Sequence, residues 1–235
     1  MIRLIYITGD THRDFARIYK FCEKQETTKN DILIILGDAG INFYNDKKDR
    51  AFKQALSNDL SINLFCIHGN HEKRPTTIST YKEMEYRGGI AYIEPEFPNL
   101  IFAKDGEVYD FNGVKTLVIG GAYSIDKFYR IRNHLTWFPD EQPDDTIKQR
   151  VENKLKELDY KVDAILSHTV PIKYEPTEVF LKGVDQSKVD KSTERWLDEI
   201  EEKTDYTKWF AGHYHTEKSI DKLRIMFNDI REFTI

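Results

Sequence analysis

Short apolar runs recur along the chain, and five of them end at a cluster of polar residues. These runs cover residues 3–8, 32–36, 62–67, 163–167 and 208–211, and they are rich in β-branched and aromatic side chains. Runs of this length that end at glycine or polar residues are typical of buried strands. The pattern therefore predicts five strands, each followed by a polar turn.

Apolar residues at helical spacing separate the first three runs. Their positions are Phe15, Ile18, Tyr19 and Cys22 in the first interval and Phe52, Ala55, Leu56 and Leu60 in the second. Strands and helices that alternate in units of about 30 residues are typical of parallel crossovers. We therefore expect a β-α-β-α-β arrangement, with further helices over residues 146–158 and 192–202.

The polar clusters contain side chains that bind divalent cations. In chain order they supply Asp10 and His12, Asp38, Asn70 and His71, His168, and His213 and His215. Carboxylate, amide and imidazole groups are common ligands of such cations. Because open α/β sheets bind ligands at the C-terminal ends of their strands, the clusters together predict a site for two metal ions.

Single members of this set have simpler explanations. A lone histidine such as His168 is more often a hydrogen-bonded structural residue than a ligand, and Asp10 or Asp38 could cap a following helix. Neither explanation accounts for histidines at several strand ends at once. Outside the set, we expect His68 to be a structural residue with satisfied hydrogen bonds and His134 to be a surface or insert residue.

The five clusters, in this order, resemble the motif series of the calcineurin-like metallophosphoesterases. That series reads Asp-x-His, Gly-Asp, Gly-Asn-His-Asp/Glu, His and Gly-His-x-His, and it extends here from Gly9 to His215. The resemblance implies one domain over residues 1–235 with a four-layer α/β/β/α sandwich. The α/β class follows from the pattern, whereas the second sheet is expected from the resemblance and from the strand-rich tail at 223–235.

The resemblance also assigns roles to the clustered residues. It implies that Asp10, His12 and His215 hold one metal, that Asn70, His168 and His213 hold the other, and that Asp38 bridges both. The mixed ligands suit Mn, Fe, Zn or Co, and we favour Mn. A hydroxide bridging the two metals is expected to attack phosphorus, while His71 protonates the leaving group or stabilises its charge.

The chain departs from one branch of this family. In the protein serine/threonine phosphatases the second motif reads Gly-Asp-x-x-Asp-Arg, whereas Ile41 and Asn42 stand at the last two positions here. An orienting partner for His71 and a phosphate-binding arginine must therefore come from elsewhere. We expect Arg130 and, to a lesser degree, Lys127 to bind substrate phosphate, because they lie in a basic segment (120–143) that follows a further predicted strand at 115–119. The alternative is a surface insert with a solvated basic run.

Composition narrows the choice of function. The chain has 235 residues, 40% of them hydrophobic, a formal charge of −5 and two cysteines, which we expect to be buried thiols. The acidic balance disfavours broad capture of nucleic acid without excluding a local basic groove. No stretch is long enough to span a membrane, and the apolar start is expected to be a strand rather than a signal peptide, so we expect a cytoplasmic protein.

The favoured function is hydrolysis of a phosphate ester by a phosphatase with two metal ions. Its substrate would be a phosphorylated small molecule or a phosphoprotein. One alternative is a phosphodiesterase that acts on cyclic nucleotides or nucleic acid. Another is a non-catalytic binding scaffold, which retention of all seven ligands and His71 disfavours. The sequence leaves the oligomeric state open.

Overall fold

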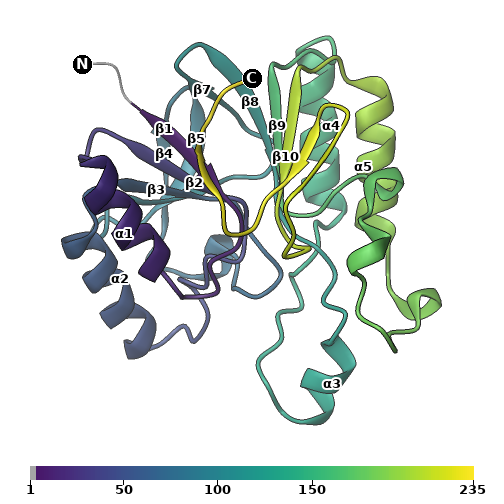
Figure 1. Ribbon diagram of the computed structural model, residues 1–235, viewed down its shortest axis with the longest axis horizontal. Helices are drawn as coiled ribbons and strands as arrows, with labels where there is room; N and C mark the ends of the chain where they lie inside the picture. Colours follow the sequence, from purple (N-terminus) through teal and green to yellow (C-terminus); the bar gives the residue numbers. More distant parts are fainter. Residues whose placement is uncertain (1–3) are drawn as a thin grey trace.

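Strands that are apolar on both faces form the centre of the protein. In β1 (Ile5–Thr8), Ile5 and Ile7 belong to the cluster between the sheets, whereas Tyr6 packs in a second cluster with helix residues. Since side chains alternate along a strand, both faces must be covered by other layers. The computed structural model, which describes residues 4–235, has this layered arrangement (Figure 1).

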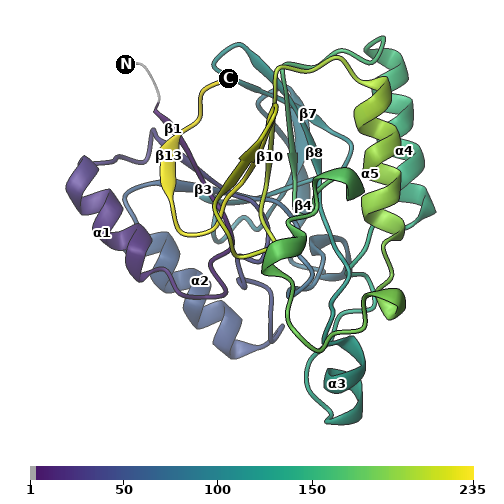
Figure 2. The same ribbon diagram turned by 45° about the vertical axis from the view of Figure 1, so that its right-hand side comes forward.

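Two sheets pack face to face, and helices cover their outer sides. Helices α1 (Ala16–Gln25) and α2 (Lys47–Asp59) cover the first sheet, while α4 (Asp145–Glu157) and α5 (Ser192–Lys203) cover the second (Figure 1). The short helix α3 (Lys127–Arg132) projects away from these layers, as Figure 2 shows. The expected four-layer α/β/β/α sandwich is therefore confirmed.

Within residues 4–235 the first sheet has seven strands in the order β13-β1-β2-β3-β6-β5-β4 and the second has six in the order β11-β12-β10-β9-β8-β7. The remaining strand bounds are β2 (Ile32–Ile35), β3 (Asn63–Cys66), β4 (Lys82–Tyr86), β5 (Gly89–Ile93), β6 (Leu100–Ala103), β7 (Val108–Phe111), β8 (Val114–Ile119), β9 (Ala164–Ser167), β10 (Lys208–Ala211), β11 (Lys218–Ile220), β12 (Leu223–Ile225) and β13 (Ile230–Glu232).

The five strands that precede the polar clusters are parallel neighbours within their sheets. Strand β2 pairs in parallel with β1 and β3, and β9 pairs in parallel with β10. Parallel strands place their C-terminal ends at the same edge of a sheet. The predicted β-α-β-α-β unit is confirmed, and the polar clusters of each sheet come together at one edge.

Three details differ from the expected pattern or complete it. The first strand starts at Ile5, and Arg3 lies outside the described residues. The tail does not belong wholly to the second sheet, because β13 pairs antiparallel with β1 and Phe233 lies buried between the sheets. Cys22 and Cys66 are buried free thiols, as expected.

No helix within residues 4–235 has the length and apolar character needed to cross a membrane.

Candidate metal centre

Tight turns after five strands present the clustered polar side chains. Four of these residues have a left-handed backbone, with φ of 45° at His12, 47° at Asp38, 70° at His213 and 50° at His215. Such φ values are uncommon outside glycine and are retained where the surrounding structure enforces them. The strained turns therefore mark this edge of the sheets as a functional region.

Two glycines in the clusters stand where a larger residue would collide with a polar side chain of the site. A Cβ atom on Gly69 would lie 2.0 Å from Asp38 Oδ1, and one on Gly37 would lie 2.0 Å from His168 Nδ1. Gly37 also has φ of +97°, which disfavours L side chains. Each glycine thus leaves space for a polar side chain: Asp38 from the turn after the neighbouring strand β2, and His168 from the turn after β9 of the other sheet.

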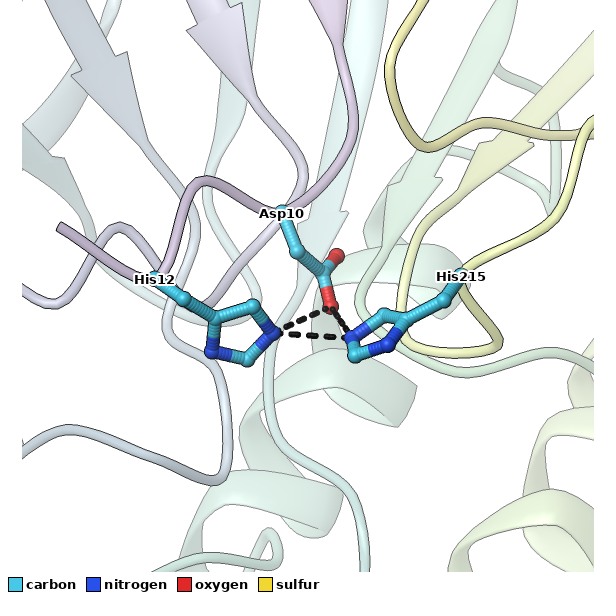
Figure 3. Close-up of side chains that lie close together, drawn as sticks. All are labelled: Asp10, His12 and His215. Carbon is cyan, nitrogen blue, oxygen red and sulfur yellow. Dashed lines mark hydrogen bonds and ion pairs between the residues drawn. The ribbon is translucent and has the colours of Figure 1, made fainter. Parts of the chain in front are cut away.

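One group of ligand atoms comes from Asp10, His12 and His215 (Figure 3). Asp10 Oδ2 lies 3.6 Å from His12 Nε2 and 3.3 Å from His215 Nε2. The two imidazole nitrogens are 2.8 Å apart. Although β1 and β10 belong to different sheets, three side chains from the turns after them point to one location that could hold a metal ion.

A second group comes from Asn70, His168 and His213. Asn70 Oδ1 lies 2.8 Å from His168 Nε2 and 3.1 Å from His213 Nδ1. His168 Nδ1 is 2.7 Å from the Leu36 carbonyl oxygen, which can only accept, so Nδ1 carries the proton. In the neutral ring Nε2 is then an unprotonated acceptor, and it faces another acceptor in Asn70. A cation between them would satisfy both, so the donor set fits a metal.

Asp38 lies between the two groups. Its Oδ2 is 3.8 Å from His12 Nε2 and 3.6 Å from His168 Nε2. Its Oδ1 accepts a hydrogen bond of 2.7 Å from the His71 backbone N–H. One carboxylate oxygen is therefore available to both groups, while the other oxygen fixes the turn that carries Asn70 and His71.

His71 faces the same region and is influenced by the projecting segment. Burial lowers the pKa of its imidazole, the charge of Asp38 opposes this, and Arg130 lowers the pKa further. Arg130 donates from Nε to Asp126 at 2.7 Å and from Nη1 to the Thr136 carbonyl at 3.1 Å. Arg130 is thus close enough for its charge to act on His71.

Lys127 is placed differently. Its Nζ lies 4.5 Å from the ring centre of Trp137 and 5.6 Å from that of Tyr123, so the ammonium packs on aromatic faces. Arg13 donates to Asp49 at 2.6 Å, and buried Arg74 pairs with buried Asp105. These contacts leave Arg130 as the basic side chain placed best with respect to His71.

Glu72, the residue after His71, carries a carboxyl that contacts the turn after β2. Glu72 is fully buried, and its Oε1 accepts from the Ala39 backbone N–H at 3.3 Å. Burial, followed by the charge of Asp38, raises the pKa of this carboxyl from 4.5 to about 8. Glu72 therefore supports the Asp38 turn as a neutral acid at pH 7.

The two histidines outside the clusters have different outcomes. His134 is exposed on the projecting segment, as expected. His68 is buried, but neither ring nitrogen has a hydrogen-bond partner within residues 4–235. The expectation of satisfied hydrogen bonds is therefore wrong, because the tightly packed strand end encloses the ring without supplying a well-aligned partner.

A cavity of about 450 Å³ opens beside the two groups, and Asp38, Asn70 and His71 line one part of it. Two residues near it had no local sequence signal. Ser124 Oγ accepts 2.9 Å from Asn70 Nδ2, which turns the amide oxygen toward the histidines. Glu194, in the first turn of α5, lines another part of the cavity. Its place in the sequence of the helix is that of an ordinary helix residue.

One solved structure supports the fold, and a second is similar to a lesser degree. The crystal structure of TT1561 of Thermus thermophilus matches with 13% sequence identity and a TM-score of 0.51, and 99% of each chain is covered. A second crystal structure has 12% identity and a TM-score of 0.49 over 96% of this chain and 90% of the other. No curated protein matches the sequence significantly.

The family comparison is more direct. The model of the calcineurin-like phosphoesterases matches residues 3–217, which include all five polar clusters. Members of this family are metal-dependent hydrolases of phosphoesters, in agreement with the donor set described above. The chain therefore belongs to the calcineurin-like phosphoesterase family.

Proposed function

We propose that the protein is a phosphatase that hydrolyses phosphate monoesters with two divalent metal ions. The observation that carries this proposal is the position of Asp38 Oδ2, which lies within 4 Å of a ligand nitrogen in each group. A carboxylate shared in this way is typical of centres whose metals are about 3.5–4 Å apart.

The two groups divide the ligands between the two ions. Asp10, His12 and His215 would hold one ion, Asn70, His168 and His213 would hold the other, and Asp38 would bridge them. The oxygen and imidazole ligands suit Mn, Fe, Zn or Co. We favour Mn because three of the seven ligands are carboxylate or amide groups, which are harder donors than imidazole.

The residues around the ions would orient and protonate the substrate. Bound metals supply a water molecule that ionises near neutral pH and polarise the phosphoryl oxygens. His71, whose backbone is fixed by Asp38 Oδ1, would donate a proton to the leaving oxygen. Arg130 would hold a phosphoryl oxygen through Nη2, because its Nε and Nη1 already donate to Asp126 and Thr136.

Activity after metal reconstitution tests this proposal. The protein would be stripped with a chelator, reloaded with Mn, Fe, Zn or Co, and assayed with p-nitrophenyl phosphate, bis-p-nitrophenyl phosphate, a phosphopeptide and cyclic nucleotides. We expect metal-dependent turnover with the highest kcat/KM on a monoester. A higher kcat/KM on the diester or on a cyclic nucleotide would instead identify a phosphodiesterase, and no turnover with any metal would reject both.

A further inference from the structure

The cavity beside the metal centre extends well beyond the ligand residues. Its volume is about 450 Å³, and its far part is formed by the start of α5 and by residues 175–189. The side chains there are mostly apolar and include Val179, Phe180 and Leu181. The Phe180 ring stacks on that of Tyr214 with 6.2 Å between centres and 15° between planes. A phosphate ester bound at the metals would place its leaving group against these walls.

One buried carboxyl in this far part has an unused oxygen. Glu194 is only 4% exposed, and its Oε1 accepts a hydrogen bond of 2.8 Å from the Thr169 hydroxyl. Its Oε2 has no hydrogen-bond partner among residues 4–235. A buried carboxylate oxygen without a partner is costly, so a ligand that donates a hydrogen bond would relieve this cost.

The charges along the wall favour a cation or a donor over an anion. Among the described residues, no lysine or arginine lines the cavity, whereas Asp126, Glu175 and Glu194 do. Asp126 and Glu175 are each paired with a base, Arg130 and Lys191 respectively, at 2.7 Å. Glu194 is the acid in this wall that has no such partner among residues 4–235.

The Tyr214 side chain connects the proposed metal ligands with Glu194 through Thr169. The Tyr214 backbone lies between the proposed ligands His213 and His215, and its hydroxyl is 3.2 Å from Thr169 Oγ1. Thr169 in turn donates to Glu194. A leaving group as long as a tyrosine side chain, anchored at the metals by its phosphate, would therefore end near the Thr169–Glu194 pair, and an amine at its end would extend it toward the carboxyl.

We propose that the far part of the cavity is a leaving-group subsite for an apolar alcohol or phenol that carries an amine, with the amine bound by Glu194. This inference rests on the proposed phosphatase function and names its substrate class. Burial raises the pKa of Glu194 to about 7, and an ammonium group bound beside this carboxyl would favour its ionised form. Polyanions such as nucleic acid or nucleoside polyphosphates fit this wall poorly because it offers them no basic partner.

Three aryl phosphates of nearly equal leaving-group reactivity test the subsite. They are 4-ethylphenyl, 4-(2-aminoethyl)phenyl and 4-(2-carboxyethyl)phenyl phosphate, in which two methylenes insulate the charge from the phenol. We expect the metal-loaded protein to prefer the aminoethyl ester over the ethyl ester by about tenfold in kcat/KM, the range of a charge-assisted hydrogen bond. The carboxyethyl ester should be the poorest of the three.

Matched variants identify the residue responsible. Glu194→Gln should reduce the preference for the aminoethyl ester to at most about threefold. The control Glu199→Gln, on the exposed side of the same helix, removes the same charge and should leave the preference unchanged. Leu181→Glu, at a side chain that is 63% exposed, should lower kcat/KM for the ethyl ester without loss of folding. An unchanged preference in Glu194→Gln would overturn the subsite.

Binding of the free leaving group separates the two proposals. Tyramine lacks phosphate, so its calorimetric binding to the metal-loaded protein requires no turnover. Weaker binding of tyramine to Glu194→Gln than to the wild type and Glu199→Gln would support the subsite. This result would support the subsite even if no ester is hydrolysed, because the absence of hydrolysis would reject the phosphatase function alone. Equal binding to all three proteins would reject the subsite while leaving measured phosphatase activity intact.

Discussion

The buried Glu72 should make the metal-free protein lose stability as the pH rises, and Glu72→Gln should remove this loss. The pKa of Glu72 is raised from 4.5 to about 8 in the folded protein. Between these values the folded state binds a proton that the unfolded state has released, so the free energy of unfolding falls as the pH increases. The slope reaches about 1.4 kcal/mol per pH unit, and the loss at pH 7 is about 3 kcal/mol.

Glutamine has the shape of the neutral acid and its carbonyl can still accept from the Ala39 N–H. The variant should therefore be more stable than the wild type by an amount that grows from about 1 kcal/mol at pH 5 to about 3 kcal/mol at pH 7. Urea unfolding with a chelator present, at several pH values between 5 and 8, measures this difference. Contributions from other titrating groups, Glu194 among them, cancel between the two proteins.

Glu23→Gln on the exposed face of α1 is the matched control, and its difference from the wild type should not depend on pH. A difference for Glu72→Gln that stays constant from pH 5 to 8 would refute the reasoning, because Glu72 would then titrate alike in the folded and unfolded states. Equal urea m-values are needed for the comparison, since a changed m-value indicates a different unfolded state.

Three further predictions concern the metal centre and the substrate phosphate. Elemental analysis of Mn-reconstituted protein should find two ions per chain. Asp38→Asn should lower the occupancy of both sites, and His12→Ala should lose mainly one ion. One ion or none at saturation in the wild type would contradict the shared-carboxylate geometry. His71→Asn should keep its metals but lower kcat by about 10²–10⁴-fold, most for alkyl esters with poor leaving groups, and an equal loss for activated aryl esters would argue against proton donation. Arg130→Ala should lower kcat/KM by about 1–3 kcal/mol in transition-state terms at unchanged metal content, whereas Arg132→Ala, on the same helix and exposed, should not.

The positions of the predicted ligands followed from local signals. Asp10 and Asp38 each come directly after a buried apolar run, so the strand pattern alone places them at an edge of the first sheet. His213 and His215 follow a run of the same kind in the second sheet. Strand ends are predictable because alternation and turn residues act over a few neighbouring positions.

Contacts that depend on tertiary packing had no local signal in the sequence. The hydrogen bond between Ser124 and Asn70 spans 54 residues, and that between Thr169 and Glu194 joins a strand end to a helix 25 residues later. In the same way, the strand-rich tail at 223–235 predicts strands but does not specify their neighbours, so the pairing of β13 with β1 was missed. The hydrophobic pattern of a strand indicates which of its faces is buried, whereas the strand that it pairs with depends on the shape and packing of other segments.

The proposed ligands are distributed from residue 10 to residue 215, and this order has a consequence during synthesis. Once residue 70 has left the ribosome, Asp10, His12, Asp38 and Asn70 can already come together through the parallel β1-β2-β3 unit. That partial set is rich in oxygen and has a single imidazole, so it suits Mg or Ca better than Mn, Fe, Zn or Co. The histidines after β9 and β10 follow only when residues 168–215 have been made. With the proposed ligand set, retention of Mn, Fe, Zn or Co would therefore require the second sheet to dock.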